Sequence, residues 1–173
     1  MRVLVAGATG AVGRQLVPQL IAAGHEVSAT TRSQRKIDSL RAAGAEPYLL
    51  DGMDGAAVGT VVARARPDVI VHEMTAIPPM MSFRKFDQEF AATNKLRTTG
   101  LDHLLAAARA MGVQRLIAQS YAGWPAARTG GPVKTEEDPF DPAPPTAMRA
   151  TAAPERRRCS RRPPGAGARW WSC

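Results

Sequence analysis

The stretch Gly7-Ala8-Thr9-Gly10-Ala11-Val12-Gly13 decides the fold, because it sets three glycines between an apolar run and an amphipathic segment. The run Val3-Leu4-Val5-Ala6 precedes it, so the pattern predicts a strand, a tight turn and a helix start. Such a turn presents backbone N–H groups at the positive end of a helix, where phosphates bind. A Walker-type loop is excluded, since no Lys-Ser or Lys-Thr pair follows the last glycine.

Each glycine of this turn has a separate expected task. Gly7 lets the chain leave the strand sharply, Gly10 removes a side chain where a pyrophosphate approaches, and Gly13 lets the helix pack closely. The alternative is a structural turn without a ligand, which the position between strand and helix makes the weaker interpretation. The residues expected around the phosphates are Gly7, Thr9, Gly10, Ala11, Val12 and Gly13.

The spacing Gly-x-x-Gly-x-x-Gly, with Ala-Thr inside it, resembles the glycine motif of the extended short-chain dehydrogenases/reductases, the NAD(P)-dependent epimerases and dehydratases. The segment 104–113 also closely resembles the family's segment before its fifth strand. The resemblance covers residues 1 to about 148. It implies an α/β fold: a doubly wound, Rossmann-type parallel sheet of about five strands in the order 3-2-1-4-5, with helices on both faces.

Composition agrees with one globular domain. The chain has 173 residues, of which 45% are hydrophobic. No apolar run approaches the roughly 20 residues that span a bilayer, and the N-terminus is typical of a strand and not of a signal peptide. We therefore expect a cytoplasmic protein that does not bind membranes. Both cysteines, Cys159 and Cys173, lie near the C-terminus, so the rest of the chain has no thiol for a disulfide or a metal.

The net charge of +8 is unevenly distributed. Residues 1–148 carry 16 Lys and Arg against 14 Asp and Glu, whereas 149–173 carry 7 Arg against Glu155 alone. We expect a domain over 1–148, incomplete at its C-terminal end, and a disordered tail over 149–173. The tail's Arg, Ala, Pro, Gly, Trp and Cys are typical of GC-rich codons read out of frame, which suggests truncation by a frameshift. The alternative is a genuine basic tail, but it lacks the repeated aromatic and basic pattern of a nucleic-acid site.

Hydrophobic periodicity predicts the other elements. In the first helix, Val12, Leu16 and Leu20 share one face, Pro18 is expected to bend the axis, and Gly24 ends it. Phe83, Phe86 and Phe90 recur at helical spacing, as core residues or as a lid. The expected helices span 11–23, 34–43, 55–66 and 101–111, and the expected strands span 25–30, 45–50, 68–72 and 114–119.

The residues after the second strand normally choose between NAD and NADP. An acidic residue there binds the ribose 2′-hydroxyl and repels a 2′-phosphate, but this chain has Thr31-Arg32-Ser33. Arg32 can pair with a 2′-phosphate and Ser33 can donate to it, while Arg35 and Lys36 add positive charge. We therefore predict NADP in preference to NAD. The alternative is that these residues only form a solvated basic helix start.

The resemblance implies further cofactor contacts. Asp51, with Gly52 beside it, stands where the family binds the adenine amino group. Asp54 is expected to cap the next helix. The family's His-Leu-Ala-Ala at the end of the fourth strand is replaced here by a segment that contains Met74 and Thr75, which are expected beside the nicotinamide half. His72 itself is expected to be a packed residue at the end of that strand.

The catalytic residues are less well marked. By resemblance, Ser120 stands where the family holds the substrate oxygen, although it could equally cap the strand end. Neither Tyr48 nor Tyr121 begins a Tyr-x-x-x-Lys motif, so the family's proton-donating dyad is absent. Asn94 lies three residues too early, relative to the alanine run, to match the family's active-site asparagine.

The function implied by the resemblance is an NAD(P)-dependent oxidoreductase or epimerase/dehydratase. It would transfer hydride to or from a small carbonyl compound or a nucleotide sugar. Two alternatives stay open: an inactive NADP-binding sensor, and a truncated product without function. The expected partner is a small-molecule substrate, without specific nucleic acid and without a metal. The resemblance also implies a homodimer, but the Ala-rich helix face on which it would rest would look the same in a monomer.

Overall fold

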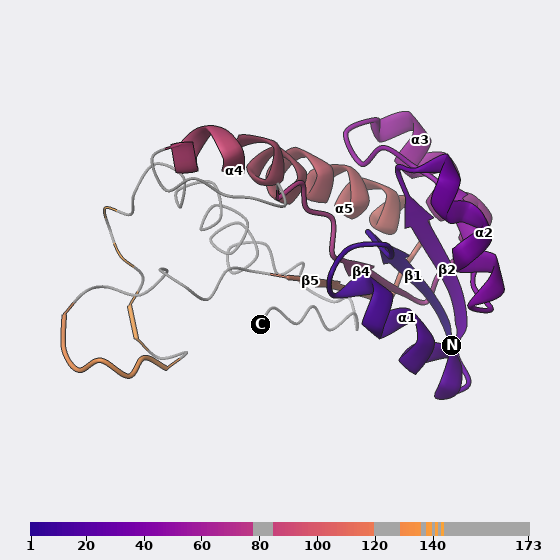
Figure 1. The fold of residues 1–173 in the computed structure, drawn as a ribbon, viewed down its shortest axis with the longest axis horizontal. Coiled ribbons are helices and arrows are strands. Elements are labelled where there is room, and N and C mark those ends of the chain that lie inside the picture. The colour runs from indigo at the N-terminus through magenta and orange to yellow at the C-terminus, as the bar shows by residue number, and fades with distance from the viewer. Residues whose placement is uncertain (78–84, 120–128, 136–137, 140, 142, 144–173) are drawn as a thin grey trace.

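The computed structural model describes residues 1–77, 85–119, 129–135, 138–139, 141 and 143. Five parallel strands form one sheet in the order β3-β2-β1-β4-β5 (Figure 1). The strands are β1 (Arg2–Ala6), β2 (Glu26–Thr31), β3 (Glu46–Leu49), β4 (Val69–His72) and β5 (Arg115–Ala118). This confirms the predicted fold class and strand order. The order reverses between β1 and β4, which creates the switch point where doubly wound proteins bind ligands.

Helices cover both faces of the sheet (Figure 1). They are α1 (Gly13–Ala22), α2 (Ile37–Ala42), α3 (Gly55–Ala65), α4 (Phe86–Lys95) and α5 (Leu101–Ala110). Because side chains alternate along a strand, Leu4 and Ala6 of β1 pack toward α3 and α5, whereas Val3 and Val5 pack toward α1 and α2. β1 is therefore buried on both sides, as a central parallel strand must be.

The first helix differs in detail from the prediction. Val17, with 1% of its surface exposed, is its main core residue, and Leu16 and Leu20 pack at the edge of the same cluster. Val12 is 44% exposed, because it precedes the first full helical turn and points away from the sheet's core. The helix continues through Pro18 and ends before Gly24, whose φ is +78°, as expected of a glycine stop.

The helix expected over 34–43 is divided. A 3-10 turn, Gln34–Lys36, precedes α2, which begins at Ile37. Asp54 caps α3 as predicted, since its Oδ1 accepts a hydrogen bond from the Ala57 N–H at 3.0 Å. The remaining predicted boundaries agree with the structure within one or two residues.

A π-helical turn, Leu96–Gly100, joins α4 to α5 without a break in the helix. Phe90 on α4 is 4% exposed and belongs to the interior, while Phe83 and the side chain of Phe86 lie outside the described residues. Thr93 is fully buried, and its Oγ1 accepts a hydrogen bond from the Ala76 N–H at 2.9 Å. The long helix is thus attached to the chain that leaves β4.

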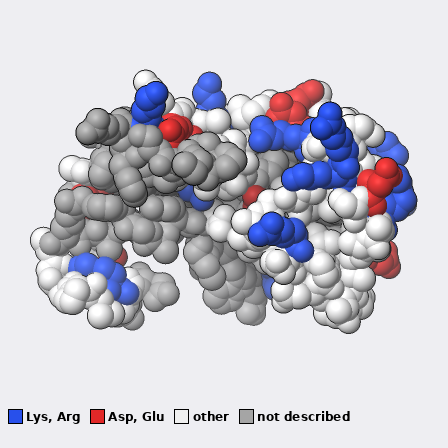
Figure 2. All heavy atoms as spheres, in the orientation of Figure 1, with Lys and Arg blue, Asp and Glu red and all other residues white. Residues whose placement is uncertain are grey.

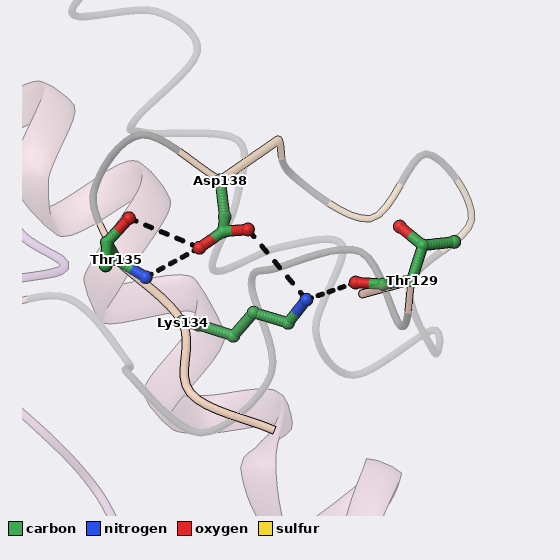
Figure 3. Close-up of polar contacts among 4 residues, drawn as sticks. All are labelled: Thr129, Lys134, Thr135 and Asp138. Carbon is green, nitrogen blue, oxygen red and sulfur yellow. Dashed lines mark hydrogen bonds and ion pairs between the residues drawn. The ribbon is translucent and has the colours of Figure 1, made fainter. Parts of the chain in front are cut away.

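Beyond β5, a polar turn is held together by Asp138 (Figure 3). Its Oδ2 accepts hydrogen bonds from the Thr135 N–H at 2.7 Å and from the Thr135 hydroxyl at 3.3 Å. The Lys134 ammonium lies 3.9 Å from Asp138 Oδ1 and also donates to the Thr129 carbonyl. The Thr135 N–H lowers the pKa of Asp138, because it stabilises the carboxylate.

No helix in the described part of the chain is long and apolar enough to cross a membrane. Within the same residues, no group of three or more His, Cys, Asp or Glu side chains could hold a metal ion.

Candidate functional site

The glycine turn after β1 is closed by its own backbone. Gly7 has φ +93°, and the Gly10 N–H donates to the Gly7 carbonyl at 3.1 Å. A Cβ built on Gly13 would stand 2.5 Å from the Gly7 carbonyl oxygen, so only glycine lets α1 start this close to the turn. Among the described residues, the N–H groups of Ala11 and Val12 have no backbone acceptor. They remain available to an anion at the start of α1.

Two threonines at the end of β2 attach the turn to the sheet. Thr30 Oγ1 accepts a hydrogen bond from the Gly7 N–H at 3.1 Å, and the hydroxyls of Thr9 and Thr31 lie 3.0 Å apart. Thr31 Oγ1 also accepts from the Ser33 N–H at 3.1 Å. Both strand threonines are almost fully buried, so these bonds are protected from water. They fix the position of the glycine turn relative to the segment that follows β2.

A cleft of about 240 Å³ opens between the carboxyl ends of β1, β2 and β4. It lies at the switch point of the sheet, where the geometry of the fold predicts a ligand. Its walls combine the glycine turn, a basic rim after β2 and an apolar patch near the long helix. The lining residues are Gly7, Thr9, Gly10, Thr30, Thr31, Arg32, Ser33, Lys36, Leu50, Gly52, Glu73, Met74, Thr75 and Leu96.

Met74, Gly52 and Leu96 form the apolar patch. A Cβ on Gly52 would stand 2.5 Å from the Met74 sulfur and 3.4 Å from a methyl carbon of Leu96. The Gly52 carbonyl oxygen lies 3.1 Å from His103 Nδ1, and this contact holds the loop against α5. Apolar surfaces of this kind suit an aromatic ring.

The structure brings eight of the predicted site residues to one cleft. They are Gly7, Thr9, Gly10, Arg32, Ser33, Gly52, Met74 and Thr75. Ala11, Val12 and Gly13 form the adjacent helix start and do not line the cleft itself. Asp51 is exposed at the end of β3, where its Oδ1 accepts from the Met53 N–H at 3.0 Å, and it also lies outside the lining. Ser120 and Tyr121 lie outside the described residues.

Several lining residues were not singled out from the sequence. Thr30 had a recognisable signal, because a polar residue ends an otherwise apolar strand beside the glycine turn. Leu50 and Leu96 had none, since their place in the cleft depends on contacts between distant segments. His72 is 2% exposed and its Nε2 lies 3.1 Å from the Leu96 carbonyl, so the expectation of a packed strand-end residue is confirmed.

Glu73 is the only acidic residue among those that line the cleft in the described part of the chain. It is partly buried, and its Oε2 is shielded from solvent without a hydrogen-bond partner among the described residues. Burial raises the pKa of Glu73, and the positive charge of Arg97 opposes this only in part. Arg97 lies in the π-helical turn and is 7% exposed.

A glycine turn at the switch point, with N–H donors at the start of α1 and a polar rim after β2, defines a dinucleotide-binding α/β protein. The cradle fits that ligand on its own geometry, because side chains at Gly7 and Gly13 would collide with neighbouring backbone. A family profile described as NAD(P)H-binding matches residues 7–156. The chain belongs to this family.

Curated relatives and solved structures of similar sequence or fold include reductases and an NAD-bound epimerase. The chain is 44% identical over 168 residues to a 3-diazoavenalumate denitrifying reductase from a Streptomyces species, with 90% of this chain and 51% of that protein covered. It is 32% identical over 125 residues to a 4-hydroxy-tetrahydrodipicolinate reductase from Natronomonas pharaonis, with 71% and 51% covered. It therefore spans about half the length of these two relatives.

Among solved structures, the UDP-glucose 4-epimerase of Thermus thermophilus in complex with NAD has a similar fold. The TM-score is 0.77 at 25% sequence identity, and the match covers 99% of this chain and 54% of the epimerase. The expected relationship to NAD(P)-dependent epimerases and reductases is thus confirmed, while the substrate is not given by the fold.

Proposed function

We propose that this chain is the cofactor-binding part of an NADPH-dependent reductase that acts on a small-molecule acceptor. The observation that carries the proposal is the cleft at the switch point, with the glycine turn on one side and Arg32, Ser33 and Lys36 on its rim. Two curated relatives named as reductases support reduction in preference to epimerisation. When bound, the reduced nicotinamide supplies a hydride to the acceptor.

The chain's own residues divide the work of binding. The N–H groups of Ala11 and Val12, which have no backbone acceptor among the described residues, would hold the diphosphate at the start of α1. Gly52, Met74 and Leu96 offer an apolar surface for a ring. Asp51 precedes Gly52 of that surface, and its carboxylate would accept a hydrogen bond from an exocyclic amine.

The basic rim supports NADP over NAD. Arg32 is exposed and lines the cleft, and the Ser33 N–H is fixed by Thr31, so both can be held toward a phosphate at the end of β2. Figure 2 shows several Lys and Arg side chains, with Asp and Glu among them, over the end of the molecule where α2 and α3 lie. The basic residues on the cleft itself, Arg32 and Lys36, favour the cofactor that carries the additional phosphate.

The test is a titration of the purified chain with NADPH and with NADH, followed by cofactor fluorescence. We expect tighter binding of NADPH, and a loss of that preference in Arg32→Asp. Arg35→Asp is the matched control, because it makes the same charge change at an exposed residue of the neighbouring 3-10 turn that does not line the cleft. Equal affinities for the two cofactors, or equal effects of the two variants, would contradict the assignment of Arg32.

A second function is favoured by one observation in the sequence. Tyr48 and Tyr121 are the two tyrosines of the chain, and neither begins a Tyr-x-x-x-Lys motif. The chain could therefore bind NADPH as a sensor without turnover. Loss of absorbance by bound NADPH in the presence of a reducible acceptor would support the reductase, whereas tight binding without oxidation by any acceptor in a broad screen would support the sensor.

A further inference from the structure

Glu73 occupies an unusual place for a carboxylic acid, because its backbone lies directly against the phosphate-binding turn. Its N–H donates to the Ala6 carbonyl at 2.7 Å, which continues the pairing of β4 with β1. Its own carbonyl oxygen would stand 2.6 Å from a Cβ on Gly7. Glu73 lines the same cleft as Gly7 and Gly10. A dinucleotide bound in this cleft therefore brings its negative charge close to Glu73.

The surroundings of the carboxyl favour its neutral form. Its Oε2 is withdrawn from water and has no hydrogen-bond partner in the described part of the chain. Burial raises the pKa of Glu73, since a charged carboxylate loses hydration there. The positive charge of Arg97, on the π-helical turn, lowers the pKa of Glu73, but this effect is smaller than that of burial. Arg32 and Lys36 line the same cleft from the segment after β2.

We propose that Glu73 is the proton-linked group of the cleft: dinucleotide binding takes up a proton from solvent onto its carboxyl, which then donates a hydrogen bond to the ligand. The inference rests on the proposed function, because it requires that the cleft binds the dinucleotide. The step is a protonation alone, in which an O–H bond forms and no electron pair leaves the protein.

The physical reason is electrostatic. An ionised carboxylate with little water around it repels a diphosphate more strongly than it would at the surface. A neutral carboxyl removes this repulsion, and its O–H can donate a hydrogen bond to an anion or to a ribose hydroxyl. Binding therefore raises the pKa of Glu73 further, and affinity must fall as pH rises through the interval between the free and the bound values.

The experiment is calorimetric titration with NADPH at neutral pH in two buffers that differ in ionisation enthalpy. The difference in observed heat gives the number of protons taken up on binding. We expect net uptake by the wild-type chain and a marked loss of it in Glu73→Gln, which keeps the shape of the side chain without a titrating group. Glu46→Gln is the matched control, because Glu46 is exposed at the start of β3 and outside the cleft. It should leave the uptake unchanged.

The pH dependence of the dissociation constant provides a second measurement. For the wild-type chain it should rise by up to about tenfold per pH unit within the linked interval. The rise should be much shallower in Glu73→Gln, and the variant should bind at least as tightly as the wild type at the upper end. Binding without proton uptake, or uptake that persists in Glu73→Gln, would overturn the assignment to Glu73 and leave the proposed function intact. Absence of binding by folded wild-type chain would overturn both.

Discussion

Gly7 and Glu73 meet backbone to backbone: a Cβ on Gly7 would stand 2.6 Å from the Glu73 carbonyl oxygen and 2.8 Å from the Met74 nitrogen. The contact joins the turn after β1 to the segment that leaves β4. Because backbone atoms of Glu73 and Met74 would collide with a Cβ, packing requires glycine at position 7. The positive φ of Gly7 favours glycine as well. Fold stability therefore depends on a glycine that also lines the cleft.

Replacement of Gly7 by alanine should destabilise the fold by about 3 kcal/mol, since the positive φ and the backbone collision both count. Gly24→Ala is the control: its φ is +78°, but nothing lies within 4 Å of the added carbon, so only about 1 kcal/mol is expected. Urea unfolding measures both. Equal losses in the two variants would mean that the contact with Glu73 costs nothing.

Removal of the imidazole of His72 should destabilise the fold by about 1–3 kcal/mol. Its Nε2 lies 3.1 Å from the Leu96 carbonyl in a buried environment, so His72→Phe leaves that carbonyl without this partner. The measurement is again the free energy of unfolding. His25→Phe, at a partly exposed position, should change it by less than about 0.5 kcal/mol. An unchanged free energy of unfolding in His72→Phe would show that the hydrogen bond to the Leu96 carbonyl does not contribute to stability.

The affinities for NADPH and NADH should respond differently to ionic strength. The additional phosphate of NADPH would lie near Arg32 and Lys36 at the exposed rim, where salt screens charge effectively. Raising the salt concentration should therefore weaken binding of NADPH more than binding of NADH. Fluorescence titrations at several salt concentrations test this. If the affinities for NADPH and NADH fell equally with salt, Arg32 and Lys36 would not be the residues that bind the additional phosphate.

The pKa of Asp68 should lie below that of an ordinary aspartate. The Arg2 guanidinium donates to its Oδ1 at 2.7 Å and the Arg2 N–H donates to its Oδ2 at 2.8 Å, and both stabilise the carboxylate. The stabilisation is therefore present above the unfolded-state pKa and is lost as pH falls through the lower folded-state value. Carboxyl NMR titration should show the midpoint of Asp68 moving upward in Arg2→Gln, which keeps the backbone donor. An unmoved midpoint would mean that the side chain has no part in it.

The sequence predicted those parts of the fold whose signals are local. The glycine turn, the apolar strands and the cap at Asp54 depend on neighbouring residues, and the structure has them in the expected places. The cleft also depends on long-range contacts. Glu73 lies between His72 and Met74, in the segment that departs from the family pattern. Its shielded carboxyl depends on packing that brings the end of β4 against the glycine turn and near Arg97 of the π-helical turn. No periodicity in the sequence could indicate that.

The π-helical turn at Leu96–Gly100 sets the rotational phase between α4 and α5. An α-helical residue advances the chain by about 100°, so deletion of one residue from this turn would rotate all of α4 by that angle relative to α5. His103 would keep its contact with the Gly52 carbonyl, while Thr93 would swing away from the Ala76 N–H and Phe90 out of the interior. The π-helical turn therefore sets the direction in which the buried side chains of α4 point, independently of those of α5, within one continuous helix.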